Sequence, residues 1–186
     1  ERRWQAASTR ALADSRVLVV GTGAIGEAIR SRLAPFETEI TRVATTARDD
    51  EHGHIHGIDE LPELLPNTDI LVLIVPLTDS TRGLIGAKEL ALLPDGALVV
   101  NVARGPVVDT DAITAEVVAG RLRMASDVFD PEPFPDDHPL WQADGAFISP
   151  HIGGNTTAML PRIVALLADQ LPRLADGREL KFVVKS

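Results

Sequence analysis

The sequence predicts an α/β protein with a doubly wound parallel sheet covered by helices on both faces. Short apolar runs alternate with helical patterns along almost the whole chain. Runs such as 17–20 and 69–75 are apolar throughout, which is typical of strands buried on both faces. A glycine-rich segment follows the first of these runs directly and precedes a helical stretch. Together these patterns predict a three-layer α/β/α architecture.

The strands and helices are expected in regular succession. The predicted strands cover 17–20, 39–45, 69–75, 96–102, 124–128 and 146–149. The predicted helices cover 27–33 (ended by Pro35), 59–65, 87–93, 109–119 and 155–175. Asp109 is expected to cap the fourth helix and Gly120 to stop it. The polar stretch 48–57 and the proline-rich stretch 130–139 are expected to be loops, and no internal linker is expected.

Composition excludes several classes of function. The chain has 186 residues with 18 basic and 27 acidic side chains, a net charge of −9. Such a surface repels phosphate backbones and anionic lipids, so neither a nucleic-acid nor a membrane partner is expected. There is no cysteine or tyrosine, which excludes disulfides, thiolate chemistry and tyrosine acid–base catalysis. No signal segment or membrane-length run is present, which predicts a soluble, cytoplasmic protein.

The glycine-rich segment 21–26 reads GTGAIG, a dinucleotide-binding fingerprint of the Rossmann type, between a strand and a helix. Gly21 permits the tight turn, Gly23 lets a pyrophosphate approach the backbone, and Gly26 lets the helix pack on its strand. The helix N-terminus then offers free N–H groups to the phosphates. The alternative is a glycine-rich turn without a ligand. The predicted cofactor contacts here are Gly21, Gly23, Ala24, Ile25 and Gly26.

The end of the second strand favours NADP over NAD. A carboxylate that binds the ribose 2′-hydroxyl is expected about 20 residues after the glycine loop. This position instead holds Thr45 and Thr46, followed by Arg48. Hydroxyl groups and a guanidinium suit a 2′-phosphate. In the alternative, Arg48 is a solvated loop residue and Asp49 or Asp50 reaches the ribose.

Four further motifs resemble the cofactor domain of the D-isomer-specific 2-hydroxyacid dehydrogenases, over about residues 4–175. They are VPLT at 75–78 with TRGLI at 81–85, NVARG at 101–105, DVF at 127–129 with EP at 132–133, and SPHIGG at 149–154. The resemblance implies a nicotinamide-dependent oxidoreductase acting on small 2-keto or 2-hydroxy acids. It also implies a homodimer. It adds these cofactor contacts: Val75, Pro76, Thr81, Val102, Ala103, Arg104, Asp127, His151, Gly153 and Gly154.

Three residues in these motifs fit the reduction of a 2-keto acid. Arg104 can bind the substrate carboxylate with its bidentate guanidinium. His151 can protonate the carbonyl oxygen as hydride arrives. Glu132 can hold and orient the imidazolium. The resemblance assigns the same roles. The alternatives are a strand-end ion pair for Arg104, a solvated carboxylate for Glu132 and a capping role for His151.

The segment 52–56, HGHIH, would place three imidazoles on one face if it were extended. That arrangement could bind a metal such as zinc. A solvated loop is the simpler interpretation, so no metal is assigned to His52, His54 or His56. The acidic run 49–51 is expected to be a solvated face.

Two other classes of function remain open. Some relatives with this fold act as dinucleotide-sensing corepressors and keep the arginine, glutamate and histidine. A methyltransferase or a short-chain dehydrogenase is a further alternative, but the first does not require these motifs and the second uses a tyrosine base. Steady turnover of a keto acid by the full-length protein would separate the enzyme from the corepressor.

Residues 1–186 are expected to be the dinucleotide-binding domain of a two-domain family. Residues 1–15 resemble the inter-domain helix or linker, and 176–186 the return toward a substrate domain. Because that domain precedes this one in the family, about 100 residues are expected to be missing through truncation, proteolysis or omission from the structure. The isolated domain should bind cofactor but turn over poorly, because the closing cleft is absent.

Overall fold

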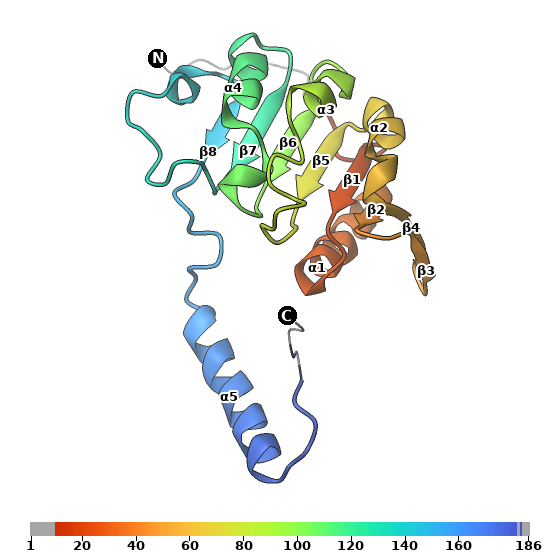
Figure 1. The fold of residues 1–186 in the computed structure, drawn as a ribbon, viewed down its shortest axis with the longest axis vertical. Coiled ribbons are helices and arrows are strands. Elements are labelled where there is room, and N and C mark those ends of the chain that lie inside the picture. Colours follow the sequence, from red (N-terminus) through yellow and green to blue (C-terminus); the bar gives the residue numbers. More distant parts are fainter. Residues whose placement is uncertain (1–9, 182, 184–186) are drawn as a thin grey trace. The chain divides into compact units, whose positions relative to one another are not determined.

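A computed structural model describes residues 10–181 and 183 (Figure 1). The chain divides into two compact units, Glu1–Pro150 and His151–Ser186. Most of the expected N-terminal linker, and residues 182 and 184–186 of the expected return segment, lie outside the described residues.

The first unit is built on an eight-stranded sheet in the order β3-β4-β2-β1-β5-β6-β7-β8. All neighbouring strands are parallel except β3 and β4. From β1 the chain builds outward through β2 and β4, then returns to place β5 on the other side of β1. This reversal is a topological switch point, and it confirms the doubly wound α/β prediction. The strands are β1 (Arg16–Val20), β2 (Glu39–Ala44), β3 (Arg48–Asp50), β4 (Gly53–Gly57), β5 (Ile70–Leu73), β6 (Leu98–Asn101), β7 (Arg123–Ser126) and β8 (Ala146–Ile148).

Successive residues of β1 face opposite sides of the sheet and enter two separate cores. Val17 and Val19 pack with Ile29 and Leu33 of α1 (Ala24–Leu33). Leu18 and Val20 belong to the larger core on the other face, with side chains from α2 (Leu61–Leu64), α3 (Ala87–Leu92) and α4 (Thr110–Val118). Helices therefore cover both faces, as expected for a parallel sheet. Burial of each large aliphatic side chain stabilises the fold by about 1.5–3 kcal/mol.

The helix boundaries agree with the predictions in outline. Asp109 caps α4, since its Oδ1 accepts a hydrogen bond from the backbone N–H of Ala112 at 2.9 Å. The helix α1 begins at Ala24, three residues earlier than predicted. Its N-cap is Gly23, which makes no side-chain hydrogen bond and so gives no capping signal in the sequence. The stretch 58–67 is a short helix, α2, between two 3-10 turns, Ile58–Glu60 and Leu65–Asn67.

The prediction of a loop at 48–57 is wrong, because this segment forms the antiparallel hairpin of β3 and β4. Ile55 is only 1% exposed, so β4 buries one large apolar side chain in the protein interior. Arg42, buried on β2, donates hydrogen bonds to both carboxylate oxygens of Asp50 and to the Gly53 carbonyl oxygen. Ile55 is the one large apolar residue in 48–57. The sequence therefore does not show the alternation of apolar and polar residues that predicts a strand. Gly53 makes the turn with φ +102°.

The second unit consists mainly of the helix α5 (Met159–Ala175) and the segments that flank it. The helix begins four residues later than predicted. Its apolar side chains are largely exposed within this unit: Met159, Leu160, Ile163, Val164, Leu166, Leu167, Leu171 and Leu174. After the helix the chain folds back, since the Lys181 ammonium lies 3.1 Å from an oxygen of Asp169. No helix of the described residues is long and apolar enough to span a membrane.

Candidate functional site

The glycine loop closes the carboxyl end of β1 at the switch point. Gly21 has φ +118°, and a Cβ there would come within 2.6 Å of the Ile74 carbonyl oxygen. A Cβ on Gly26 would lie 1.9 Å from the Gly21 carbonyl oxygen. Gly21 is therefore required by the close approach of the loop to the end of β5, and Gly26 by the close packing of α1 on the loop.

Gly23 differs from both, because a Cβ there would have no neighbouring atom within 4 Å. Gly23, Ala24 and Ile25 are exposed at the start of α1. Packing within the protein therefore does not require a glycine at position 23. A side chain there would instead occupy the open space above the loop. The first N–H groups of the helix and the open surface of Gly23 suit a pyrophosphate.

Arg48 extends from β3 back to the glycine loop. Its Nη2 donates a hydrogen bond to Oγ1 of Thr22 at 2.8 Å. Thr45 and Thr46 are exposed in the turn between β2 and β3. The contact of Arg48 with Thr22 places a guanidinium beside the glycine loop, and a guanidinium is a group that suits a phosphate.

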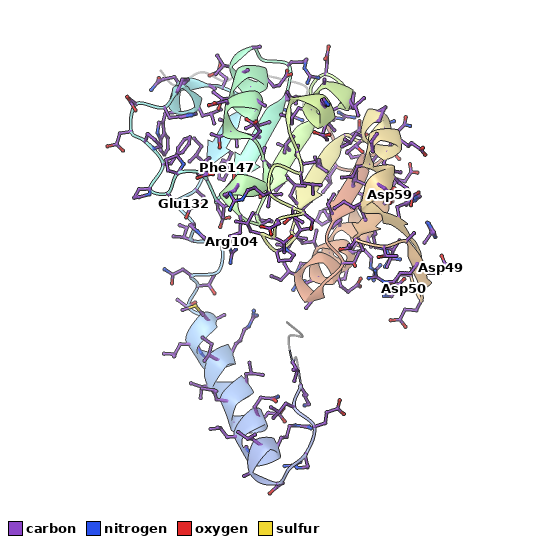
Figure 2. The ribbon with its side chains drawn as sticks, in the orientation of Figure 1. Asp49, Asp50, Asp59, Arg104, Glu132 and Phe147 are labelled. Atoms are coloured by element: carbon purple, nitrogen blue, oxygen red, sulfur yellow. The ribbon has the colours of Figure 1, made fainter. Side chains whose placement is uncertain are left out.

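Asp49 and Asp50, the alternative ribose ligands, lie on the hairpin (Figure 2), and both have side-chain partners, on β4 and β2 respectively. Asp50 forms a bidentate ion pair with Arg42, and this pair holds the pKa of the Asp50 carboxyl well below its usual range. Oδ1 of Asp49 lies 2.8 Å from Nδ1 of His54. These contacts do not favour the alternative in which either carboxylate reaches the ribose.

The segment after β5 carries Val75, Pro76 and Thr81. The Thr81 side chain is buried and ties this segment together. Its Oγ1 donates to the Pro76 carbonyl oxygen at 2.6 Å and accepts from the Thr78 N–H at 2.8 Å. Thr81 therefore fixes the backbone at the carboxyl end of β5, next to β1.

Arg104 lies three residues beyond the end of β6, after the exposed Val102 and the buried Ala103. Asn101 braces this turn. Its Oδ1 accepts from the Ala103 N–H and its Nδ2 donates to the Arg104 carbonyl oxygen, both at 3.1 Å. The Arg104 side chain is exposed and donates to the Ala103 carbonyl oxygen at 2.6 Å.

The loops of Arg104 and Glu132 adjoin each other. A Cβ on Gly105 would overlap the Phe129 carbonyl group, so the backbones after β6 and β7 are in close contact there. Oε1 of Glu132 accepts a hydrogen bond from the Phe129 N–H at 2.8 Å. Arg104 and Glu132 thus belong to neighbouring loops at one edge of the sheet (Figure 2), and Asp127 directly follows β7.

The remaining predicted residues, His151, Gly153 and Gly154, belong to the second unit. All three are exposed, and His151 has a left-handed backbone conformation with φ +53°. The structure therefore groups the predicted residues of the first unit at the carboxyl ends of β1, β2, β5, β6 and β7.

Sequence reasoning did not identify Thr22 or Asn101 as supporting residues. Thr22 is one of the three variable positions of the fingerprint, and its contact with Arg48 spans 26 residues of sequence. Asn101 could have been noticed as a buried amide at the end of an apolar strand, where its side chain must find polar partners.

Residues 1–153 match the family model described as D-isomer specific 2-hydroxyacid dehydrogenase, NAD binding domain. A glyoxylate reductase from Thermofilum pendens is 36% identical over 162 residues, covering 86% of this chain and 48% of that protein. A chloroplastic/mitochondrial formate dehydrogenase of Arabidopsis thaliana is 31% identical over 173 residues, covering 89% and 45%. The chain spans about half the length of the curated relatives it matches.

Solved structures agree with the sequence matches. A D-isomer specific 2-hydroxyacid dehydrogenase from Xanthobacter autotrophicus Py2, in complex with NADPH and MES, is 34% identical with a TM-score of 0.86, covering 98% of this chain and 76% of its own. An NADPH-dependent glyoxylate/hydroxypyruvate reductase from Sinorhizobium meliloti, in complex with NADP and sulfate, is 25% identical with a TM-score of 0.86, covering 98% and 59%. The chain belongs to the D-isomer-specific 2-hydroxyacid dehydrogenase family and carries its NAD-binding domain.

Proposed function

We propose that this protein transfers a hydride between a nicotinamide dinucleotide, with NADPH preferred, and a small 2-keto or 2-hydroxy acid. The observation that carries the proposal is the glycine loop at the switch point. Gly21 and Gly26 are required by packing, whereas Gly23 leaves open surface at the helix N-terminus. A packed turn without a ligand would not need glycine at position 23.

The residues of the first unit would hold the dinucleotide along the carboxyl edge of the sheet. The loop 21–26 would bind the pyrophosphate, and Thr45, Thr46 and Arg48 the ribose 2′-phosphate. Val102, Ala103 and Asp127 would contact the nicotinamide end. Other contacts with the cofactor would come from Val75, Pro76 and Thr81. When bound, the cofactor supplies the hydride.

Arg104, Glu132 and His151 are proposed to carry the substrate chemistry. Arg104 binds the substrate carboxylate, His151 donates the proton to the carbonyl oxygen, and Glu132 orients the imidazolium. The adjoining loops of Arg104 and Glu132 support this assignment for two of the three residues. For His151, Gly153 and Gly154 the support is the SPHIGG motif at 149–154, which follows the other motifs in sequence order.

Relatives support the cofactor and the substrate class. Structures with NADP or NADPH bound include one from Rhizobium etli that also holds L(+)-tartaric acid, a 2-hydroxy acid. Two curated relatives are named glyoxylate reductase. Small 2-keto acids such as glyoxylate and hydroxypyruvate are therefore the proposed substrates, and a homodimer is the proposed assembly, to be measured by sedimentation.

The test is steady-state oxidation of NADPH by the full-length protein with a panel of 2-keto acids. We expect saturable turnover with at least one small acid and a higher kcat/KM with NADPH than with NADH. Tight dinucleotide binding without turnover of any acid would instead support a dinucleotide-sensing binding protein. A tenfold preference for NADH would overturn the cofactor assignment.

A further inference from the structure

The hairpin of β3 and β4 presents two histidines on one face. His54 and His56 are two residues apart on β4, so their side chains lie on the same side of the strand, and Ile55 between them is buried on the other. The two imidazole rings meet edge to face with centroids 4.7 Å apart. The structure thus brings together two groups that the sequence alone placed in a solvated loop.

Two carboxylates adjoin this histidine pair. Nδ1 of His56 lies 2.7 Å from Oε2 of Glu60, which belongs to the 3-10 turn after β4. Nδ1 of His54 lies 2.8 Å from Oδ1 of Asp49, its cross-strand partner on β3. One ligand atom each from His54, His56 and Glu60 lie within 4.8 Å of one another.

Glu60 is held in place by the backbone as well as by His56. Its Oε1 accepts a hydrogen bond from the Gly57 N–H at 2.7 Å, which leaves Oε2 directed at the imidazole. Both carboxylate oxygens of Glu60 are thus held in fixed positions, and an ordinary glutamate is ionised at neutral pH. The cluster is therefore a preorganised set of one anionic oxygen and two imidazoles.

The cluster lies apart from the proposed dinucleotide site. On β3, Arg48 and Asp50 alternate with Asp49 and therefore face the opposite side of the hairpin. That opposite side carries the contacts with Thr22 and Arg42. The histidine cluster has no role in cofactor or substrate chemistry under the proposed function.

We propose that His54, His56 and Glu60 form a binding site for a divalent transition metal of the zinc class. Imidazole and carboxylate are ligands that Zn²⁺ accepts in tetrahedral sites, whereas Mg²⁺ and Ca²⁺ prefer all-oxygen sets. Bonds of about 2.0–2.2 Å would replace the hydrogen bond between His56 and Glu60 with bonds to the metal, and the half-exposed His54 would turn toward this pair. A solvent molecule completes the coordination, and the Asp49 carboxylate orients His54 as carboxylates do in other zinc sites.

The metal would join β3, β4 and the turn of Glu60. Asp49 holds His54 from β3, and both histidines lie on β4. A bound ion would therefore stabilise the outer edge of the sheet against local opening. Metal that binds the folded protein more tightly than the unfolded chain raises the Tm.

The experiment is isothermal titration of the untagged, chelator-treated protein with ZnCl₂, and with MgCl₂ for comparison. We expect one Zn²⁺ per chain and no saturable Mg²⁺ binding. H54Q, H56Q and E60Q should each weaken Zn²⁺ binding more than about tenfold. His52→Gln is the matched control, because His52 lies in the same hairpin but outside the three-residue cluster.

A thermal shift provides the second readout. Zn²⁺ should raise the Tm of the parent and of H52Q but not of H54Q or H56Q. Far-ultraviolet circular dichroism of each variant establishes that loss of binding does not reflect loss of fold. The proposal is overturned if no one-to-one binding is seen, if H56Q and E60Q bind as the parent does, or if H52Q loses binding equally.

Discussion

Arg48 and Thr22, which are 26 residues apart in sequence, are joined by a hydrogen bond of 2.8 Å from Nη2 to Oγ1. This contact brings a cation from the β3–β4 hairpin to the loop that begins α1. Because Asp50 on the same strand is paired with the buried Arg42, the hairpin is anchored to β2 on the side from which Arg48 extends. The cofactor preference of the protein is thus proposed to depend on a hairpin rather than on a flexible loop.

Replacement of Arg48 by Gln should change cofactor preference. Hydrogen bonds to charged groups contribute about 1.5–3 kcal/mol, so kcat/KM for NADPH should fall roughly 10- to 100-fold while that for NADH stays within twofold. The measurement is steady-state kinetics of the full-length protein with both cofactors. Arg32→Gln, which alters an exposed arginine on α1, is the control and should change neither value.

The two glycines at positions 23 and 26 should respond differently to alanine. Gly26→Ala introduces a Cβ against the Gly21 carbonyl oxygen and should cost about 1–3 kcal/mol of unfolding free energy. Gly23→Ala meets no protein atom and should leave stability unchanged but weaken dinucleotide binding at least tenfold. Urea unfolding and fluorescence titration with NADPH measure the two effects. Equal loss of stability in both variants would contradict this division of roles.

Asp69 should make stability depend on pH in the acid range. Its buried carboxylate accepts hydrogen bonds from the backbone and side chain of Arg16, which hold its pKa well below the ordinary value. Folding therefore favours the ionised form. The resulting stability is complete above the ordinary aspartate pKa of about 3.9 and is lost as the pH falls toward the folded value.

Asp69→Asn should lower the unfolding free energy by about 2 kcal/mol at neutral pH, and by progressively less as the pH falls below about 4. Urea unfolding at several pH values measures this. Asp95→Asn, at a carboxylate that is 89% exposed, should change stability by less than about 0.5 kcal/mol at every pH. A pH-independent effect at Asp69 would rule out the ionised carboxylate as its cause.

Arg104→Lys should separate substrate binding from cofactor binding. A lysine keeps the charge but loses the bidentate geometry, so KM for the keto acid should rise at least about tenfold. Dinucleotide affinity should stay within twofold, because the contacts assigned to this turn come from its backbone, which Asn101 holds. Kinetics on the full-length protein and cofactor titration measure the two quantities.

His151→Gln should lower kcat by about 10²- to 10⁴-fold, the usual contribution of a general acid. The glutamine can still donate a hydrogen bond but cannot transfer the proton, so cofactor affinity should be preserved. His138→Gln is the matched control for histidine loss and should leave kcat unchanged, since His138 caps the 3-10 turn Pro139–Gln142. An unchanged kcat for His151→Gln would remove the proton-donor role.

The parallel sheet could be predicted because its central strands are continuous apolar runs, which follows from burial on both faces. The hairpin could not, because β4 has one buried side chain, Ile55, and its polar residues resemble those of a loop. The start of α1 was placed too late for a related reason. Its N-cap is Gly23, which has no side chain and so gives none of the usual capping signals.

The positions of the candidate site residues at strand ends could be predicted, since parallel strands bring their carboxyl ends to one edge. Their contacts could not be predicted. The bracing of the Arg104 turn by Asn101 depends on the position of a buried amide, and the contact of Gly105 with the Phe129 backbone joins two loops that only the sheet order makes adjacent. Local sequence patterns carry no information about such pairs.

The outermost strand β3 also bears on how the protein behaves at high concentration. All three of its residues, Arg48, Asp49 and Asp50, are charged and exposed, and the strand is only three residues long. An unpaired strand edge is a template for association with another chain, and charged side chains make it a poor one. The hairpin therefore ends the sheet in a way that discourages intermolecular strand pairing and aggregation at this edge.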